Sequence, residues 1–129
     1  MLVIDASVAV QLALRDALER LARHEVHAPE LLWSESASAL RQLAWRQDVS
    51  DELATAALAS LAAAPVVHVE PRSLVAEAYD VARRMGWAKT YDAEYVALAA
   101  RLGCPLVTLD ARLARSAKRL VEVAPPSRI

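Results

Sequence analysis

Residues 90–110 read TYDAEYVALAARLGCPLVTLD, and this stretch combines a helix, a stop signal and a short apolar run. Apolar residues recur at helical spacing over 91–102, with no Pro or Gly between them, which predicts a helix. Gly103 and Pro105 then end that helix, because Gly readily adopts the left-handed conformation and Pro cannot continue a helix. Residues 106–109 are too few for another helix and are typical of a strand buried on both faces.

Two carboxylates in this stretch occupy unusual positions. Asp92 shares a helical face with Tyr95 and Val96, three and four residues further on, and Asp110 ends the apolar strand. A carboxylate in apolar surroundings is unfavourable unless it is paired, hydrogen-bonded or bound to a metal. Each acid also has an ordinary interpretation, Asp92 as a first-turn acid that complements the helix dipole and Asp110 as the cap of the next helix.

Length and composition restrict the class of protein. A chain of 129 residues is expected to form one domain, and 56% hydrophobic with 24% charged residues argues against disorder. The net charge of −1 provides no general attraction to nucleic acid, so any RNA binding must be local or carried by metal. A single cysteine, Cys104, excludes an internal disulfide framework. Because no stretch is suitable as a signal peptide or a membrane span, we expect a cytoplasmic protein with no membrane association.

The rest of the chain alternates between short apolar runs and longer periodic segments. The predicted strands cover 2–4, 26–28, 66–69, 106–109 and 120–123; the predicted helices cover 8–22 with a break near Arg15 and Asp16, 30–45 beginning just after Pro29 at the first helical position, 51–63, 72–85, 91–102 and 111–118. This alternation predicts a parallel sheet with helices on both faces. Right-handed crossovers then bring the carboxyl ends of the strands to one edge, where α/β proteins bind ligands.

Four acids can converge at that edge. Asp5 and Asp110 end strands, whereas Glu35 and Asp92 lie on inward faces of helices. Glu35 also has an ordinary interpretation as a boundary residue whose carboxylate reaches water. Clustered carboxylates repel one another and therefore favour a bound proton or cation. Because these ligands are all oxygens and the three histidines show no metal-binding spacing, Mg²⁺ or Mn²⁺ is expected rather than zinc.

Two hydroxyls lie next to these acids. Ser7 follows Asp5 by two residues and is expected either to cap the following helix or to hydrogen-bond Asp5. Thr108 precedes Asp110 by two residues, so it is expected to contact a metal-bound water or a phosphate oxygen, or simply to fill a strand position. A metal ion held by carboxylates can activate a water that stays bound to it, and that water can attack a phosphodiester.

Four blocks of the sequence resemble a known family. They are VIDASV at 3–8, APELLWSESASAL at 28–40, TYDAEYVALA at 90–99 and PLVTLDARL at 105–113. Together they resemble the PIN-domain ribonucleases and, more narrowly, the VapC-type toxins of type II toxin–antitoxin pairs. The resemblance implies a fold of the α/β class: a three-layer α/β/α sandwich with a central parallel sheet of about five strands. It implies Mg²⁺- or Mn²⁺-dependent endonucleolytic cleavage of RNA, with catalytic and metal-binding residues Asp5, Glu35, Asp92 and Asp110 and supporting residues Ser7 and Thr108.

The resemblance also implies partners. The usual ones are a second copy of the toxin, forming a homodimer, and a VapB-type antitoxin whose C-terminal tail blocks the site. For RNA, the cations Lys89, Arg112 and Arg115 are candidates for phosphate contacts, although each taken singly is more typical of a solvated charged face. The three tryptophans, Trp33, Trp45 and Trp87, are candidates for stacking on unpaired bases, with Trp33 better suited to the core or an interface.

Three other functions fit parts of the pattern. One is a protein of this fold that binds RNA or a partner without catalysis, and another is a free-standing PIN nuclease with no antitoxin. Retention of all four acids argues against a non-catalytic protein. A phospho-acceptor receiver domain is disfavoured because the predicted strand 66–69 ends in Glu70 and no Lys follows 120–123.

Overall fold

Five short strands form one parallel sheet in the computed structural model, which describes residues 1–129. They are β1 Leu2–Ile4, β2 Val26–Pro29, β3 Val67–Val69, β4 Leu106–Val107 and β5 Val123–Ala124. Their order in the sheet is β3-β2-β1-β4-β5, and every neighbouring pair is parallel, as predicted. The strand order reverses between β1 and β4, which is where open α/β sheets bind ligands.

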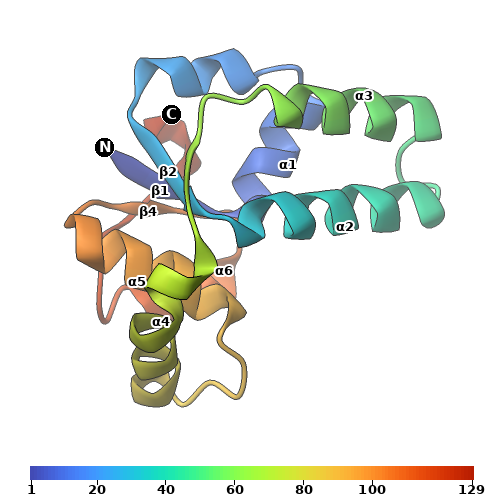
Figure 1. The fold of residues 1–129 in the computed structure, drawn as a ribbon. Helices are drawn as coiled ribbons and strands as arrows, with labels where there is room; N and C mark the ends of the chain where they lie inside the picture. Colours follow the sequence, from blue (N-terminus) through green and yellow to red (C-terminus); the bar gives the residue numbers. More distant parts are fainter.

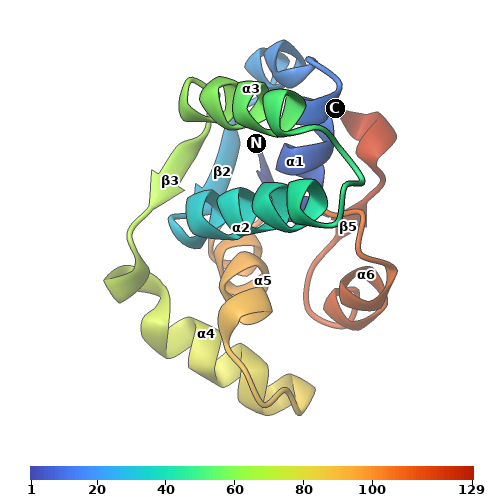
Figure 2. The same ribbon diagram turned by 90° about the vertical axis from the view of Figure 1, so that its right-hand side faces the viewer.

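Helices cover both faces of this sheet. They are α1 Ala6–Leu14, α2 Leu31–Trp45, α3 Asp51–Ala62, α4 Pro71–Met85, α5 Tyr91–Leu102 and α6 Ala111–Ala117, with 3-10 helices at Leu18–Arg23 and Pro126–Arg128. α1 and α3 lie on one side of the sheet and α4 and α5 on the other, while α2 and α3 form a hairpin that projects beyond the sheet (Figures 1 and 2). The expected three-layer α/β/α sandwich is therefore confirmed. None of the helices has the length and apolar character needed to span a membrane.

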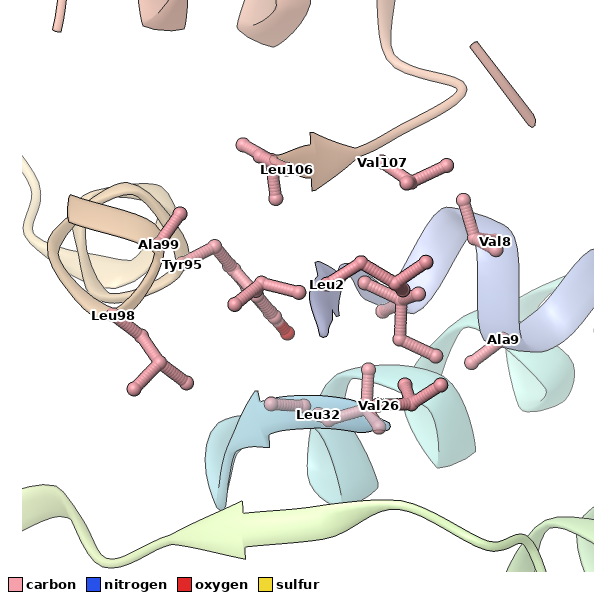
Figure 3. Packing of buried hydrophobic residues seen from close by; sticks show 14 of the residues in the cluster. Leu2, Val8, Ala9, Val26, Leu32, Tyr95, Leu98, Ala99, Leu106 and Val107 are labelled. Atoms are coloured by element: carbon pink, nitrogen blue, oxygen red, sulfur yellow. The ribbon is translucent and has the colours of Figure 1, made fainter. Parts of the chain in front are cut away.

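The core lies where α5 crosses the central strands. β1 is buried along its whole length, and the apolar face of α5 contributes Tyr95, Val96 and Leu98, none more than 1% exposed (Figure 3). A strand covered on both faces buries consecutive residues, which explains the unbroken apolar runs in the sequence. Each large apolar side chain buried here adds about 1.5–3 kcal/mol to the stability of the folded state. This packing holds the ends of β1 and β4 together.

The first helix differs from the predicted 8–22. It begins at Ala6, because the Asp5 side chain caps it by accepting a hydrogen bond from the Val8 N–H at 3.2 Å. The expected break is confirmed: α1 ends at Leu14, and Asp16 adopts a left-handed backbone (φ 52°) before the first 3-10 helix.

Other element boundaries also differ from the prediction; β4, for example, ends at Val107 rather than at 109. Pro29 is the last residue of β2 rather than the first of a helix; the contact with β3 continues through the Glu30 N–H, which donates to the Val69 carbonyl at 2.9 Å, so no N–H is needed at Pro29. The final strand is Val123–Ala124 rather than 120–123, because the N–H groups of Leu120 and Val121 still bond the end of α6.

Candidate active site

The four acids selected from the sequence lie on elements that meet at the carboxyl edge of the sheet. Asp5 follows β1, Asp110 follows the neighbouring β4, Glu35 lies in the second turn of α2, and Asp92 is the second residue of α5. The charge of Asp110 raises the pKa of both Asp5 and Asp92, and the charges of Asp92 and Asp5 raise that of Glu35. Each of the four carboxylates is thus close enough to repel at least one of the others.

Asp5 is held most firmly of the four. It is only 5% exposed, and three donors surround its carboxylate: the Ser7 hydroxyl at 2.5 Å, the Val8 N–H at 3.2 Å, and the Thr108 hydroxyl. The hydrogen bond from Ser7 selects one of its two expected roles, since Asp5 itself caps α1. Thr108 lies beyond the end of β4, and its hydroxyl is likewise directed to Asp5.

The same two hydroxyls connect Asp5 to the loop between β4 and α6. Ser7 Oγ accepts from the Leu109 N–H at 3.0 Å, and Thr108 Oγ1 accepts from the Asp110 N–H at 3.0 Å. Each hydroxyl therefore receives a loop N–H and donates to the Asp5 carboxylate. This network fixes both the orientation of Asp5 and its position relative to Asp110.

Glu35 is positioned by a residue that the sequence did not identify as functional. The Tyr95 hydroxyl donates to Glu35 Oε1 at 3.2 Å, joining α5 to α2. Tyr95 is 1% exposed, and its pKa is strongly raised by burial and by the charges of Glu35, Asp5 and Asp92. The phenol therefore stays protonated and acts only as a donor to Glu35. Its place three residues after Asp92 on the same helical face was the available signal.

The electrostatics of the site disfavour bare carboxylates. Burial is the main cause of the raised pKa of Asp5, Glu35 and Asp92, and repulsion by neighbouring acids adds to it. Hydrogen bonds from Ser7, Thr108 and Val8 oppose the shift at Asp5, and Arg112 opposes it at Asp92. None of these three acids forms an ion pair. A bound cation would relieve this repulsion.

Asp110 has a different environment. It is exposed, and its Oδ1 accepts hydrogen bonds from the N–H groups of Arg112 at 2.8 Å and Leu113 at 3.1 Å, which makes it the N-cap of α6. The ordinary interpretation of Asp110 as a helix cap thus describes its contacts, while its charge still acts on Asp5 and Asp92.

A fifth acid, Glu94, escaped the sequence analysis. It is half-buried on α5, its Oε1 is buried without a hydrogen-bond partner, and burial raises its pKa. Its charge also raises the pKa of Glu35. A residue two positions after Asp92 lies on another side of the helix, so helical spacing could not associate it with the site.

The chemistry of these side chains suits a divalent cation better than the distances between them do. As they stand, no three Asp, Glu, His or Cys side chains are close enough together to hold a metal ion. The donors available are carboxylate and hydroxyl oxygens, and the histidines lie elsewhere: His27 contacts Glu25, and His68 is on the edge strand β3. Mg²⁺ typically binds one or two carboxylates and keeps several waters, so these acids can hold it without closing around it.

A cleft of about 820 Å³ opens beside the acids. We call it the acid cleft, and its lining includes Glu35, Asp92, Lys89, Arg112, Trp87 and Tyr91. It thus contains two of the three predicted RNA-binding cations. The third, Arg115, is exposed on α6 but does not line the cleft.

A second hollow of about 660 Å³ lies at the tip of the α2–α3 hairpin. This tip hollow is lined by polar and apolar residues that include Arg41, Trp45, Asp48, Asp51 and Glu52. Trp45 is 74% exposed there, whereas Trp33 is half-buried and packs edge-on against His68, with ring centroids 6.4 Å apart. The interpretation of Trp33 as a packing residue agrees with this contact.

Comparison with known proteins identifies the family. The PIN domain profile matches residues 2–119. The chain is 36% identical over 115 residues to VapC ribonuclease Mb0985 of Mycobacterium bovis, covering 88% of each chain. Among solved structures it is similar to PAE2754 from Pyrobaculum aerophilum (TM-score 0.77, 25% identity, 98% of this chain and 91% of that one). It also shares its fold with VapBC2 from Rickettsia felis bound to a promoter DNA fragment (TM-score 0.64, 12% identity, 96% and 97%). The chain therefore belongs to the PIN domain family and, within it, to the VapC ribonucleases.

Proposed function

We propose that this protein is an endoribonuclease toxin that hydrolyses RNA phosphodiesters with the help of Mg²⁺ or Mn²⁺. The observation that carries the proposal is the burial of Asp5 and the partial burial of Glu35 and Asp92 without any ion pair. Three elements bring these acids together, their pKa values are all raised, and none has a cationic partner within 4.0 Å. Burying like charges side by side is unfavourable unless a ligand compensates, and a divalent cation is the ligand that oxygen donors select.

Each acid has a distinct part in the proposal. Asp5, oriented by Ser7 and Thr108, is the fixed ligand, and Glu35, oriented by Tyr95, approaches from α2. Asp92 contributes from the first turn of α5, and Asp110 is the outermost acid, adding negative charge or a water-mediated contact. When bound, the cation would activate a water, orient the phosphate and stabilise the charge that develops in the transition state.

The substrate contacts we propose are local rather than global. Lys89 and Arg112 line the acid cleft together with Asp92, and each can pair with a phosphate oxygen. Arg115, one turn further along α6, would contact a phosphate outside the cleft. Since the chain as a whole carries a net charge of −1, these few cations must supply the electrostatic attraction to RNA.

We also propose two protein partners, a second copy of this chain and a VapB-type antitoxin. The support is that exposed large apolar side chains lie on two separate parts of the surface: Val75 and Tyr79 on α4, and Trp45, Leu53 and Leu58 on the α2–α3 hairpin. Contiguous exposed apolar surface commonly marks interaction sites. The assembly of VapBC2, which shares this fold, supports the antitoxin.

Cleavage of RNA tests the activity directly. Purified protein is incubated with total cellular RNA in Mn²⁺, alongside the same reaction in EDTA and the variant Asp5→Asn. We expect discrete fragments that disappear in both controls. RNA binding that persists in EDTA, with no cleavage in Mn²⁺, would instead favour the non-catalytic binding protein. Cleavage by a protein that copurifies with no antitoxin and is inhibited by none would favour the free-standing nuclease.

A further inference from the structure

One of the three tryptophans, Trp87, lines the acid cleft and is half-buried. It also packs against the core. Its position is set by the end of α4: Gly86 adopts a left-handed backbone (φ 71°), and the Trp87 N–H then donates to the Ala82 carbonyl at 2.8 Å. Because the side chain already packs against the core, it has less conformational entropy to lose on binding than a freely exposed one.

A second aromatic side chain lines the same cleft. Tyr91 is the first residue of α5, immediately before Asp92, and is 58% exposed. Neither its ring nor its hydroxyl takes part in the hydrogen bonds that position the acids. An exposed aromatic residue next to a proposed catalytic acid is therefore free to contact a ligand.

The charges of the acid cleft make phosphate contacts alone a weak basis for binding. Its cations Lys89 and Arg112 are matched in number by its acids Glu35 and Asp92. Two phosphate contacts to a single strand give a salt dependence with a log–log slope of only about −1.4. Two such contacts make a limited contribution, so contacts other than ion pairs would add substantially to the binding free energy of a nucleic acid held here.

We infer that Trp87 and Tyr91 form a nucleobase-binding subsite of the acid cleft, which takes an unpaired RNA base by stacking. The inference rests on the proposed function, because the phosphodiester next to the stacked base is the bond that would be hydrolysed at the acids. Stacking on aromatic side chains requires bases that are splayed out, and bases inside an A-form duplex are not. The volume of about 820 Å³ is within the range of small-ligand sites, so a nucleotide fits.

Binding measured without cleavage tests this subsite. The variant Asp5→Asn serves as the background, in Mg²⁺, with a short end-labelled single-stranded RNA of mixed sequence followed by fluorescence polarisation. Adding Trp87→Leu should weaken binding roughly 5- to 150-fold, the range measured for loss of one base–aromatic stack. Trp87→Phe should restore most of the affinity. The control is Val67→Ala, which removes an exposed apolar side chain from the edge strand β3, does not touch the lining of the acid cleft and should leave the affinity unchanged.

An RNA strand that lacks its bases separates stacking from charge. Binding of an abasic ribose–phosphate oligomer should be unaffected by Trp87→Leu. Lys89→Ala, in contrast, should weaken binding of the abasic and the base-containing oligomers to the same extent. If Trp87→Leu unfolds the protein, Trp87→Phe and Tyr91→Leu carry the test, because Tyr91 is largely exposed. Tyr91→Leu should weaken binding of the base-containing strand only.

The outcomes distinguish the subsite from the nuclease. If neither Trp87→Leu nor Tyr91→Leu changes the cleavage or the binding of single-stranded RNA, the subsite is overturned and the nuclease stays intact. Equal affinity for a duplex and a single strand would overturn it too. A protein that cuts no RNA, yet shows the base- and Trp87-dependent binding, would retain the subsite and lose the proposed activity.

Discussion

The acid cleft and the tip hollow resemble each other in composition and differ in electrostatics. Each is lined by an arginine, a tryptophan and at least two acids. In the tip hollow, Asp48, Asp51 and Glu52 are all exposed. Asp51 and Glu52 also lie in the first turn of α3, where the helix dipole favours negative charge, behind a Ser50 cap that accepts from the Leu53 N–H at 3.1 Å.

The acids of the acid cleft have no such compensation. Glu35 and Asp92 are half-buried, and their pKa values are raised by burial and by neighbouring carboxylates. Acidic residues clustered on a surface are thus not enough to indicate a site. What marks the site is that the fold keeps carboxylates partly buried and close together at an energetic disadvantage that a ligand can remove.

The largest contrast is expected in catalysis. Asp92→Asn should lower the rate of RNA cleavage on the order of 10²–10⁴-fold, because it removes a ligand of the proposed cation and with it several kcal/mol of transition-state stabilisation. The matched substitution in the tip hollow, Asp51→Asn, should leave the rate unchanged. Equal rates for the two variants in single-turnover assays would end the distinction between the regions.

The supporting hydroxyl should matter less than the acid it orients. Thr108→Val keeps the side-chain shape but removes the hydrogen bond to Asp5, so we expect a 10- to 100-fold loss of activity, as for other residues that orient metal ligands. Since that hydrogen bond lowers the pKa of Asp5, the acidic limb of the pH–rate profile should also move to higher pH. A purely structural Thr108 would lower stability without moving the profile.

Metal binding should stabilise the protein through the acid cleft alone. A cation at a hundred times its dissociation constant adds about 2.7 kcal/mol to the free energy of unfolding. For a chain of this length, that raises the melting temperature by roughly 5–20 °C. Differential scanning fluorimetry in Mn²⁺ should show this increase for the native protein and for Asp51→Asn. Persistence of the full increase in Asp92→Asn or Asp5→Asn would place the cation elsewhere.

The smallest effect is a pH dependence in the absence of metal. Because folding raises the pKa of Asp5, Glu35 and Asp92, the folded state binds more protons than the unfolded state between the two sets of values. In chelator, the free energy of unfolding should therefore increase as the pH falls from neutral through the raised pKa values, with the gain complete below about 4. Glu77, whose pKa is lowered by its hydrogen bond from Arg101, has the opposite effect, so the measurement is best made in Glu77→Gln. Urea titrations showing no such increase, or a decrease, would contradict the electrostatic account.

The sequence predicted much of the fold because its signals were local. The apolar runs located β1 to β4, and the left-handed Gly103 ended α5 as expected. The errors occurred where a tertiary contact decided the boundary. Pro29 remained in the sheet because β3 lies beside it, and the last strand began later because α6 ended in extra turns.

The site was predicted only in part for a related reason. Residue type and strand ends brought out the four acids, but their partners come from distant segments: Thr108 contacts Asp5 across 103 residues, and Tyr95 contacts Glu35 across 60. Periodicity along one helix cannot reveal such contacts. Periodicity also could not show that Asp110 is exposed and accepts hydrogen bonds as the cap of α6, or that Glu94 is half-buried.

The most direct test of the central claim is the position of manganese in crystals grown or soaked with Mn²⁺. Anomalous scattering locates the ion without assumptions about activity. We expect a peak at the carboxyl edge of the sheet, in contact with Asp5 and Asp92 directly or through water. A peak only in the tip hollow, among Asp48, Asp51 and Glu52, or no ordered manganese at concentrations that support cleavage, would contradict it.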